Sequence, residues 1–282
     1  MSTTLVSVET LQAHLFDAGW CVVDCRHELS NFAAGREQYD AGHVPGAVFA
    51  RIEEDLSGPK TGRNGRHPLP DREALAATFG AWGIGNGTQV VAYDAAGGAF
   101  ASRLWWLARW LGHDRVALLD GGWPAWLAAT QWASREPAMR EPARFEVRPS
   151  LAPTVDAAEV LARIGRADKL TVDARLAERF EGRVEPLDPV AGHIPGTVNR
   201  PWQANLDQGR LKPREALRRE FEALLGGRPA RDLAVLCGSG VTACHHLLAL
   251  EHAGLSGAAL YPGSWSEWVA DPSRPVATGA AP

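Results

Sequence analysis

Leu233-Ala-Val-Leu-Cys237-Gly-Ser-Gly-Val-Thr-Ala243 is the most informative segment of this 282-residue chain. An apolar run of strand length ends at Cys237, and two glycines follow at alternate positions. The next residues, 244–252, have the apolar pattern of a helix. The segment therefore predicts a strand, a tight loop and a helix, with a thiol at the point where the strand ends.

The loop after this strand has the composition of an anion-binding turn. Glycine allows positive φ and a close approach of the backbone, so successive amides can point inward at one atom. A following helix adds about half a positive charge at its N-terminus. Such surroundings favour an ionised thiol, and we expect Cys237 to be a nucleophilic thiolate. The alternative is a buried cysteine that only packs. The amides expected to form the cradle belong to Gly238, Gly240, Val241, Thr242 and Ala243.

The chain contains one pattern twice, about 145 residues apart. Gly42-His-Val-Pro-Gly46 recurs as Gly192-His-Ile-Pro-Gly196, and Asp120-Gly-Gly-Trp-Pro-Ala-Trp126 recurs as Pro262-Gly-Ser-Trp-Ser-Glu-Trp268. These matches, in the same order in both halves of the chain, indicate an internal duplication. We expect two domains, at 1–132 and 154–282, joined by a proline-rich linker at 133–153.

Each copy alternates short apolar runs with helical stretches, which favours an α/β fold. We expect each domain to be a mainly parallel sheet flanked by helices, with strands of the second copy at 170–173, 233–236 and 258–261. Sites in such sheets form at the carboxyl ends of the strands, where Cys237 stands. The first copy has Asp94 at the corresponding position. A carboxylate cannot carry a group as a thiol does, so the first domain is expected to be catalytically silent.

Composition excludes several classes of function. The formal net charge is −4, from 29 basic and 33 acidic residues, which gives no support for nucleic acid or an anionic membrane as a partner. The four cysteines lack zinc-type spacing, and the N-terminus lacks a signal-peptide pattern. We therefore expect reduced thiols, a cytoplasmic location, no metal and no cofactor.

The Cys237–Ala243 loop, the paired Gly-His-[Val/Ile]-Pro-Gly turns and the 263–268 motif together resemble the tandem-domain rhodanese family. Within it, the chain is most similar to the 3-mercaptopyruvate sulfurtransferases. The resemblance implies that the Cys237 thiolate takes sulfur from a small-molecule donor and becomes a persulfide. A thiophilic acceptor, such as cyanide, a small thiol or a protein thiol, then removes the outer sulfur. Ser239 is implied in protonating the fragment that leaves.

The resemblance also implies how the donor is bound. Arg179 aligns with the family's main anion-binding arginine, and a guanidinium pairs with a carboxylate in fork geometry. The family's second arginine falls here on Asp188, which weakens the match. Arg183 is a candidate to take its place.

Two further features have alternative interpretations. His43 is a candidate for binding the donor, but His193 occupies the same place in the other copy, which favours a turn residue. The basic, glycine-rich loop 60–67 either reaches the site or is a solvated surface loop.

Three other functions compete with this prediction. Thiosulfate is the alternative donor, although relatives that use it have basic residues where this chain has Gly238 and Ser239. A cysteine phosphatase needs an arginine at position 243, which is alanine. A non-catalytic binding module of this family usually lacks the cysteine. We expect an enzyme that prefers 3-mercaptopyruvate.

Overall fold

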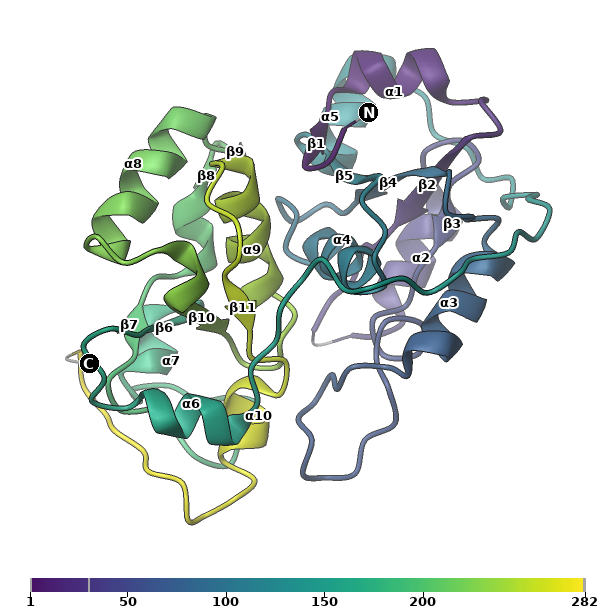
Figure 1. Ribbon diagram of the computed structural model, residues 1–282. Coiled ribbons are helices and arrows are strands. Elements are labelled where there is room, and N and C mark those ends of the chain that lie inside the picture. The colour runs from purple at the N-terminus through teal and green to yellow at the C-terminus, as the bar shows by residue number, and fades with distance from the viewer. Residues whose placement is uncertain (1, 30, 281–282) are drawn as a thin grey trace. The chain divides into compact units, whose positions relative to one another are not determined.

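The computed structural model describes residues 2–29 and 31–280, and the chain divides into two compact units (Figure 1). Unit 1 holds the residues up to Gly58, Pro70–Leu151 and Asp207–Leu211. Unit 2 holds Pro59–Leu69, Ala152–Leu206 and the residues from Lys212 onward. Each unit therefore includes a short segment from the half of the sequence that forms most of the other unit.

Unit 1 is built on a five-stranded sheet with the order β1-β5-β4-β2-β3, in which every pairing is parallel. Its strands are β1 (Leu5–Val6), β2 (Trp20–Asp24), β3 (Val48–Phe49), β4 (Gln89–Tyr93) and β5 (Val116–Leu119). Its helices are α1 (Val8–His14), α2 (Ala34–Ala41), α3 (Arg72–Ala81), α4 (Ala101–Trp110) and α5 (Gly122–Thr130). Parallel strands require crossover connections, and the helices supply them.

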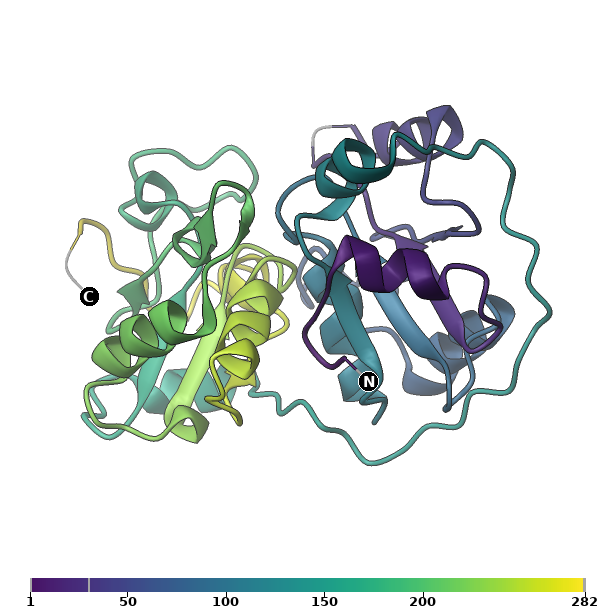
Figure 2. The ribbon, with the colours of Figure 1, turned by 90° about the horizontal axis from the view of Figure 1, so that it is seen from above.

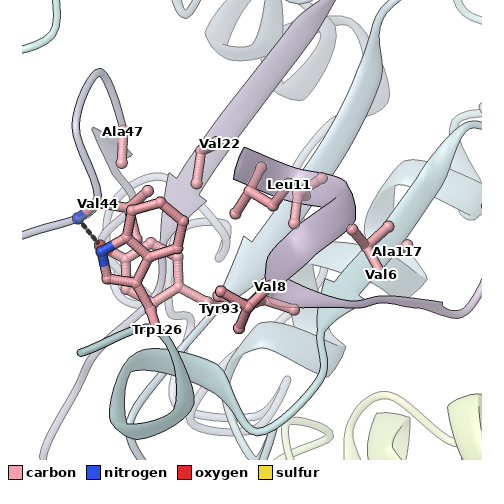
Figure 3. Packing of buried hydrophobic residues seen from close by; sticks show 11 residues of the cluster. Val6, Val8, Leu11, Val22, Val44, Ala47, Tyr93, Ala117 and Trp126 are labelled. Atoms are coloured by element: carbon pink, nitrogen blue, oxygen red, sulfur yellow. Dashed lines mark hydrogen bonds between the residues drawn. The ribbon is translucent and has the colours of Figure 1, made fainter. Parts of the chain in front are cut away.

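Helices cover both faces of this sheet. In Figure 1, α1 and α5 lie over one face, and α3 and α4 lie over the other. The first face is packed by side chains such as Leu11 of α1 and Trp126 of α5 against Val22 of β2 (Figure 3). In the same cluster, the Tyr93 hydroxyl accepts a hydrogen bond from the Val44 amide at 3.1 Å. The turn that holds Val44 is thereby tied to the end of β4.

Unit 2 repeats this arrangement with a four-stranded sheet of order β11-β10-β6-β7, again with parallel pairings. An isolated parallel bridge from Thr154 to Leu260 takes the place of a fifth strand. The strands of its sheet are β6 (Leu170–Asp173), β7 (Val198–Asn199), β10 (Leu233–Leu236) and β11 (Ala259–Leu260). Strands β8 (Leu206–Asp207) and β9 (Arg210–Leu211) form a separate two-stranded ribbon, of which residues Asp207–Leu211 belong to unit 1. The helices are α6 (Ala157–Arg163), α7 (Ala177–Phe180), α8 (Arg214–Leu225), α9 (Ala243–His252) and α10 (Ser264–Trp268), with 3-10 turns η1 (Trp202–Asn205) and η2 (Ala230–Asp232).

The layers of unit 2 correspond to those of unit 1. Its core cluster joins Val160 of α6 and Trp265 of α10 to Leu236 of β10. Helices α8 and α9 lie side by side on the other face, as Figure 1 and Figure 2 show. The prediction of an α/β fold with two parallel sheets flanked by helices is therefore confirmed. The predicted strand 258–261 is shorter in the structure, because pairing with β10 involves only Ala259 and Leu260.

The duplication extends to buried ion pairs. Arg26 donates to both oxygens of Asp24 and, through Nη2, to the carbonyl of Gly42 at 2.7 Å. Arg175 makes the same contacts with Asp173 and with the carbonyl of Gly192, also at 2.7 Å. Each arginine therefore ties the end of a central strand to the Gly-His turn that follows it.

Residues 131–156 contain no helix or strand, apart from isolated bridges at Ser134 and Thr154. Up to Leu151 this segment belongs to unit 1, where the amide of Ala143 donates to Gly80 and that of Arg148 donates to Leu111. In the part of the chain that the structure describes, no helix is both long and apolar enough to span a membrane.

Candidate active site

Cys237 follows the last residue of β10, at the carboxyl edge of the sheet of unit 2. Its sulfur accepts a hydrogen bond from the Gly240 amide at 3.2 Å. Gly240 has φ of +77°, and a β-carbon there would collide with the carbonyl of Pro262. Glycine is therefore required at 240 if the amide is to face the sulfur.

The beginning of α10 fixes the backbone around the thiol. The Cys237 amide donates to the Ser264 hydroxyl at 3.1 Å, and the Trp265 amide donates to the Cys237 carbonyl at 3.0 Å. The Ser266 amide donates to the Gly238 carbonyl, also at 3.0 Å. These contacts explain why the 263–268 motif accompanies the cysteine loop in the sequence.

The rest of the predicted cradle lies at the beginning of α9. Thr242 is the N-cap residue of that helix and Ala243 its first residue, and Val241 comes just before them. Amides in this position have no intrahelical acceptor, and the helix dipole makes them a favourable place for an anion. The predicted helix 244–252 thus begins one residue earlier in the structure.

In unit 1 the loop that corresponds to the cysteine loop holds a carboxylate. Asp94, at the position of the cysteine, accepts four backbone hydrogen bonds: Oδ1 from Ala96 and Gly98, and Oδ2 from Phe100 and Ala101, all at 2.8–2.9 Å. Its carbonyl accepts from the Trp123 amide, as that of Cys237 does from Trp265. In unit 1 a carboxylate of the chain itself fills the loop.

A cluster of charged side chains lies beside the cysteine loop. The Arg179 guanidinium donates to both oxygens of Glu185, at 3.2 and 2.7 Å. Glu185 also accepts from the amides of Leu187 and Asp188. Burial alone would raise the pKa of Glu185, but Arg179 and these amides hold that pKa below its ordinary value.

Positive charge also lies close to the thiol itself. Burial lowers the pKa of Arg175, but the carboxylates of Asp173 and Glu185 and the nearby Cys237 sulfur more than offset this, so the pKa is raised. Cys237 is buried in this conformation. A β-carbon built on neighbouring Gly238 would lie 3.3 Å from Nη1 of Arg179. The surface over that loop residue is therefore cationic.

The segment Pro59–Leu69 belongs to unit 2 and contributes two side chains that were not among the predicted site residues. Nδ1 of His67 lies 2.8 Å from the hydroxyl of Ser239. Arg66 forms an ion pair with Asp188, and its Nη2 would lie 2.8 Å from a β-carbon on Gly238. Of the two interpretations of loop 60–67, the structure supports the one in which it reaches the site.

Two predicted donor-binding residues make other contacts in the structure. The side chain of Arg183 is 62% exposed and pairs with Glu181, which argues against its taking the place of the missing arginine. His43 is buried in unit 1, with its ring nitrogens 2.8 and 2.9 Å from the carbonyls of Tyr39 and Glu136. Its counterpart His193 has the same contact, from Nδ1 to the carbonyl of Phe180 at 2.8 Å. These contacts favour the turn-residue interpretation of His43.

Within residues 2–29 and 31–280, no group of three or more His, Cys, Asp or Glu side chains is arranged to hold a metal ion. None of the four cysteines, all of which lie in the described part of the chain, forms a disulfide bond there.

Comparisons with known proteins agree with this geometry. A family model described as a rhodanese-like domain matches residues 7–129 and again 156–271. A protein of Pseudomonas aeruginosa named as a probable 3-mercaptopyruvate sulfurtransferase is 48% identical over 281 residues, covering 99% of each chain. A thiosulfate sulfurtransferase of Gallus gallus is 32% identical, covering 92% of this chain and 90% of that one.

A solved structure, the 3-mercaptopyruvate sulfurtransferase from Leishmania major, superposes with a TM-score of 0.81 at 30% sequence identity. The match covers 94% of this chain and 74% of that one. The two family matches fall on the two copies of the internal repeat, and the second copy holds the thiol, its glycine loop and the arginine beside it. The chain belongs to the rhodanese-like family and contains two copies of its domain.

Proposed function

We propose that this protein is a sulfurtransferase that moves sulfur from 3-mercaptopyruvate to a thiophilic acceptor through a persulfide on Cys237. One observation carries the proposal: the cysteine loop combines a nucleophile and a cation. The Cys237 sulfur accepts a hydrogen bond from the Gly240 amide, and the guanidinium of Arg179 lies beside Gly238. A sulfur nucleophile is thus held beside a cation that can bind the donor's carboxylate.

In the first half-reaction, the Cys237 thiolate attacks the sulfur of the donor. A sulfur–sulfur bond forms and the carbon–sulfur bond of 3-mercaptopyruvate breaks, with its electron pair left on the carbon as the enolate of pyruvate. The proton from the donor's thiol must reach that carbon, which gives pyruvate and an anionic persulfide. The amides at the start of α9 would stabilise the outer sulfur, because they have no acceptor within the helix.

Ser239 and His67 are the groups proposed to move this proton. The 2.8 Å contact between the serine hydroxyl and the imidazole is a hydrogen bond through which a proton can pass. Both side chains are buried, which keeps bulk water away from the enolate. Ser239 is therefore proposed as a catalytic residue, and His67 as its partner.

In the second half-reaction, cyanide, a small thiol or a protein thiol attacks the outer sulfur, and the Cys237 thiolate leaves. With cyanide the product is thiocyanate, and charge is conserved. Unit 1 is proposed to be silent, because Asp94 occupies its loop. The four cysteines form no disulfide in the described structure, and this supports the proposal of a reducing, cytoplasmic setting.

Thiosulfate is the second candidate donor, because the Gallus gallus relative is named for it. Two features favour 3-mercaptopyruvate. The name of the Pseudomonas relative, at 48% identity, refers to that donor. The hydrogen bond between Ser239 and His67 can serve proton transfer to a leaving enolate, whereas the sulfite released from thiosulfate needs no proton.

Intact-mass spectrometry after incubation with each donor tests the proposal. We expect 3-mercaptopyruvate to add one sulfur to the wild-type chain, and to add none to Cys237→Ser. Cys244→Ser, at the other thiol of this segment, is the matched control and should still gain the sulfur. With cyanide as acceptor, kcat/KM should be higher for 3-mercaptopyruvate than for thiosulfate. A wild-type chain that gains no sulfur from either donor would overturn the proposal.

A further inference from the structure

The cluster beside Cys237 contains a carboxylate where the family resemblance implies a second arginine. The side chain of Asp188 is 3% exposed and lies between two guanidiniums. It forms an ion pair with Arg66, and one of its oxygens is 3.3 Å from Nη2 of Arg179. A second guanidinium, that of Arg66, therefore lies beside Arg179, although Arg66 is more than a hundred residues earlier in the chain than Asp188.

The backbone around Arg66 is held firmly against the cysteine loop. The Arg66 amide donates to the Ser266 hydroxyl at 3.0 Å. Gly65 has φ of +83°, and a β-carbon there would lie 2.8 Å from the carbonyl of Gly263. The next residue, His67, contacts Ser239. Arg66 thus stands between two anchored neighbours, and its position depends on the same loop and motif that position Cys237.

The two guanidiniums converge on one point of the site. A β-carbon on Gly238 would lie 2.8 Å from Nη2 of Arg66 and 3.3 Å from Nη1 of Arg179. Gly238 follows the nucleophile directly, so both cations are next to the place where a donor must enter. Its lack of a side chain leaves room for them.

The exposure of these groups shows which of them a ligand can reach. The side chains of Asp188 and Glu185 are 3% and 4% exposed, whereas those of Arg66 and Arg179 are 28% and 15% exposed. The carboxylates therefore lie behind the guanidiniums. An arrangement of this kind fixes the two arginines and leaves their remaining N–H groups available to an anion.

We propose that Arg66 is a donor-binding residue, which binds the carboxylate of the sulfur donor together with Arg179, and that Asp188 is the positioning residue for Arg66. This inference rests on the proposed function, because the donor's carboxylate is what the two arginines would bind. In this chain, Arg66 of the 59–69 segment would thus bind the donor, because an aspartate at position 188 cannot bind a carboxylate.

The test compares Arg66→Gln with Arg63→Gln in the full-length protein. Arg63 lies in the same segment and is exposed, so it is a matched control. For Arg66→Gln we expect KM for 3-mercaptopyruvate to rise about tenfold or more, with a much smaller change in kcat, because hydrogen bonds to a charged group are lost. Arg63→Gln should retain the wild-type KM.

A second measurement separates donor binding from a structural role. After the persulfide has been loaded, its outer sulfur is released to dithiothreitol, which is uncharged at neutral pH. We expect this step to run at the wild-type rate in Arg66→Gln, since no carboxylate is bound in it. If Arg66 served only to pair with Asp188, the substitution would lower the melting temperature and leave KM unchanged, and the inference would be wrong.

The reversed pair provides a third variant. Arg66→Asp alone places two carboxylates together and should weaken donor binding more than Arg66→Gln does. Adding Asp188→Arg restores an ion pair with a cation at 188, so KM should recover by about tenfold or more relative to Arg66→Asp. If the double variant folds but its KM does not recover, the inference is wrong.

The outcomes also separate this inference from the proposed function. If Cys237→Ser is inactive while KM is the same in wild type and Arg66→Gln, the inference fails and the proposed function stands. A wild-type chain that gains no sulfur from 3-mercaptopyruvate would overturn both.

Discussion

Asp94→Asn tests the idea of an anion-binding loop in unit 1, whose loop has an aspartate at the position of Cys237. Each oxygen of the Asp94 carboxylate accepts two backbone amides at 2.8–2.9 Å. The substitution replaces one oxygen with an NH₂ group, so two amides would then face a donor in place of an acceptor. The side chain is buried, and water cannot easily take over the lost contacts.

The expected cost follows from those two contacts. A hydrogen bond to a charged group contributes about 1.5–3 kcal/mol, so losing two lowers the free energy of unfolding of unit 1 by about 3–6 kcal/mol. A domain is usually stable by about 5–15 kcal/mol, and the loss is therefore a large part of the total. Unit 1 should unfold at clearly lower urea concentration than in the wild-type protein.

Urea unfolding combined with hydrogen-exchange mass spectrometry measures this effect. Exchange should accelerate in peptides from β4 and α4 of unit 1, and much less in peptides from β10 and α9 of unit 2. Asp114→Asn, at an exposed aspartate of unit 1, is the control and should change stability by less than about 0.5 kcal/mol. A loss below about 1 kcal/mol in Asp94→Asn would refute the reasoning, because the amides would then not depend on an anion.

Three further predictions concern unit 2. Gly240→Ala should lower kcat/KM about 100-fold or more, because the added carbon collides with Pro262 and moves the amide away from the sulfur. The control is Gly209→Ala, at a glycine with the same φ of +77° but open space around it, and it should keep full activity. Ser239→Ala should lower kcat with 3-mercaptopyruvate about 100-fold or more and change kcat with thiosulfate far less, so equal losses with both donors would exclude a role in protonation. Glu185→Gln should lower the melting temperature at pH 7. The pKa of Glu185 is held below its ordinary value of 4.5, so its stabilising effect is present above that pH and is lost as the pH falls through the lowered pKa. The difference from wild type should therefore narrow in acid, and a constant difference would contradict this assignment.

Much of the fold follows from the sequence, because the internal repeat provides two independent copies of the same pattern. The strands expected at 170–173 and 233–236 are found as β6 and β10 with the same bounds. Alternation of short apolar runs with helical stretches was enough to predict parallel pairing, because such strands need helical crossovers. The strand predicted at 258–261 is longer than β11, because the apolar run extends beyond Ala259 and Leu260, the two residues that pair with β10.

The local pattern predicts only the part of the site that is continuous in sequence, whereas Arg179 was predicted from the family resemblance. Cys237, its glycines and the start of α9 form one continuous segment, and local backbone chemistry determines their arrangement. Arg66 and His67 act on that segment from far upstream, and no periodicity connects them to it. Two features pointed to them: an aspartate at 188 where the resemblance implies an arginine, and a basic loop at 60–67, for which reaching the site was one of two open interpretations. Arg183 was a candidate for the second cation because it lies near Arg179 in sequence, but its side chain is exposed and pairs with Glu181.

The inclusion of Pro59–Leu69 in unit 2 has a consequence for how the two copies can be separated. A chain cut between residues 131 and 151 would keep the sulfur nucleophile on one fragment and leave Arg66 and His67 on the other. The two halves repeat one sequence pattern, yet each compact unit includes a segment from the other half. The fragment with Cys237 would then lack the hydrogen bond from His67 to Ser239 and the ion pair from Arg66 to Asp188.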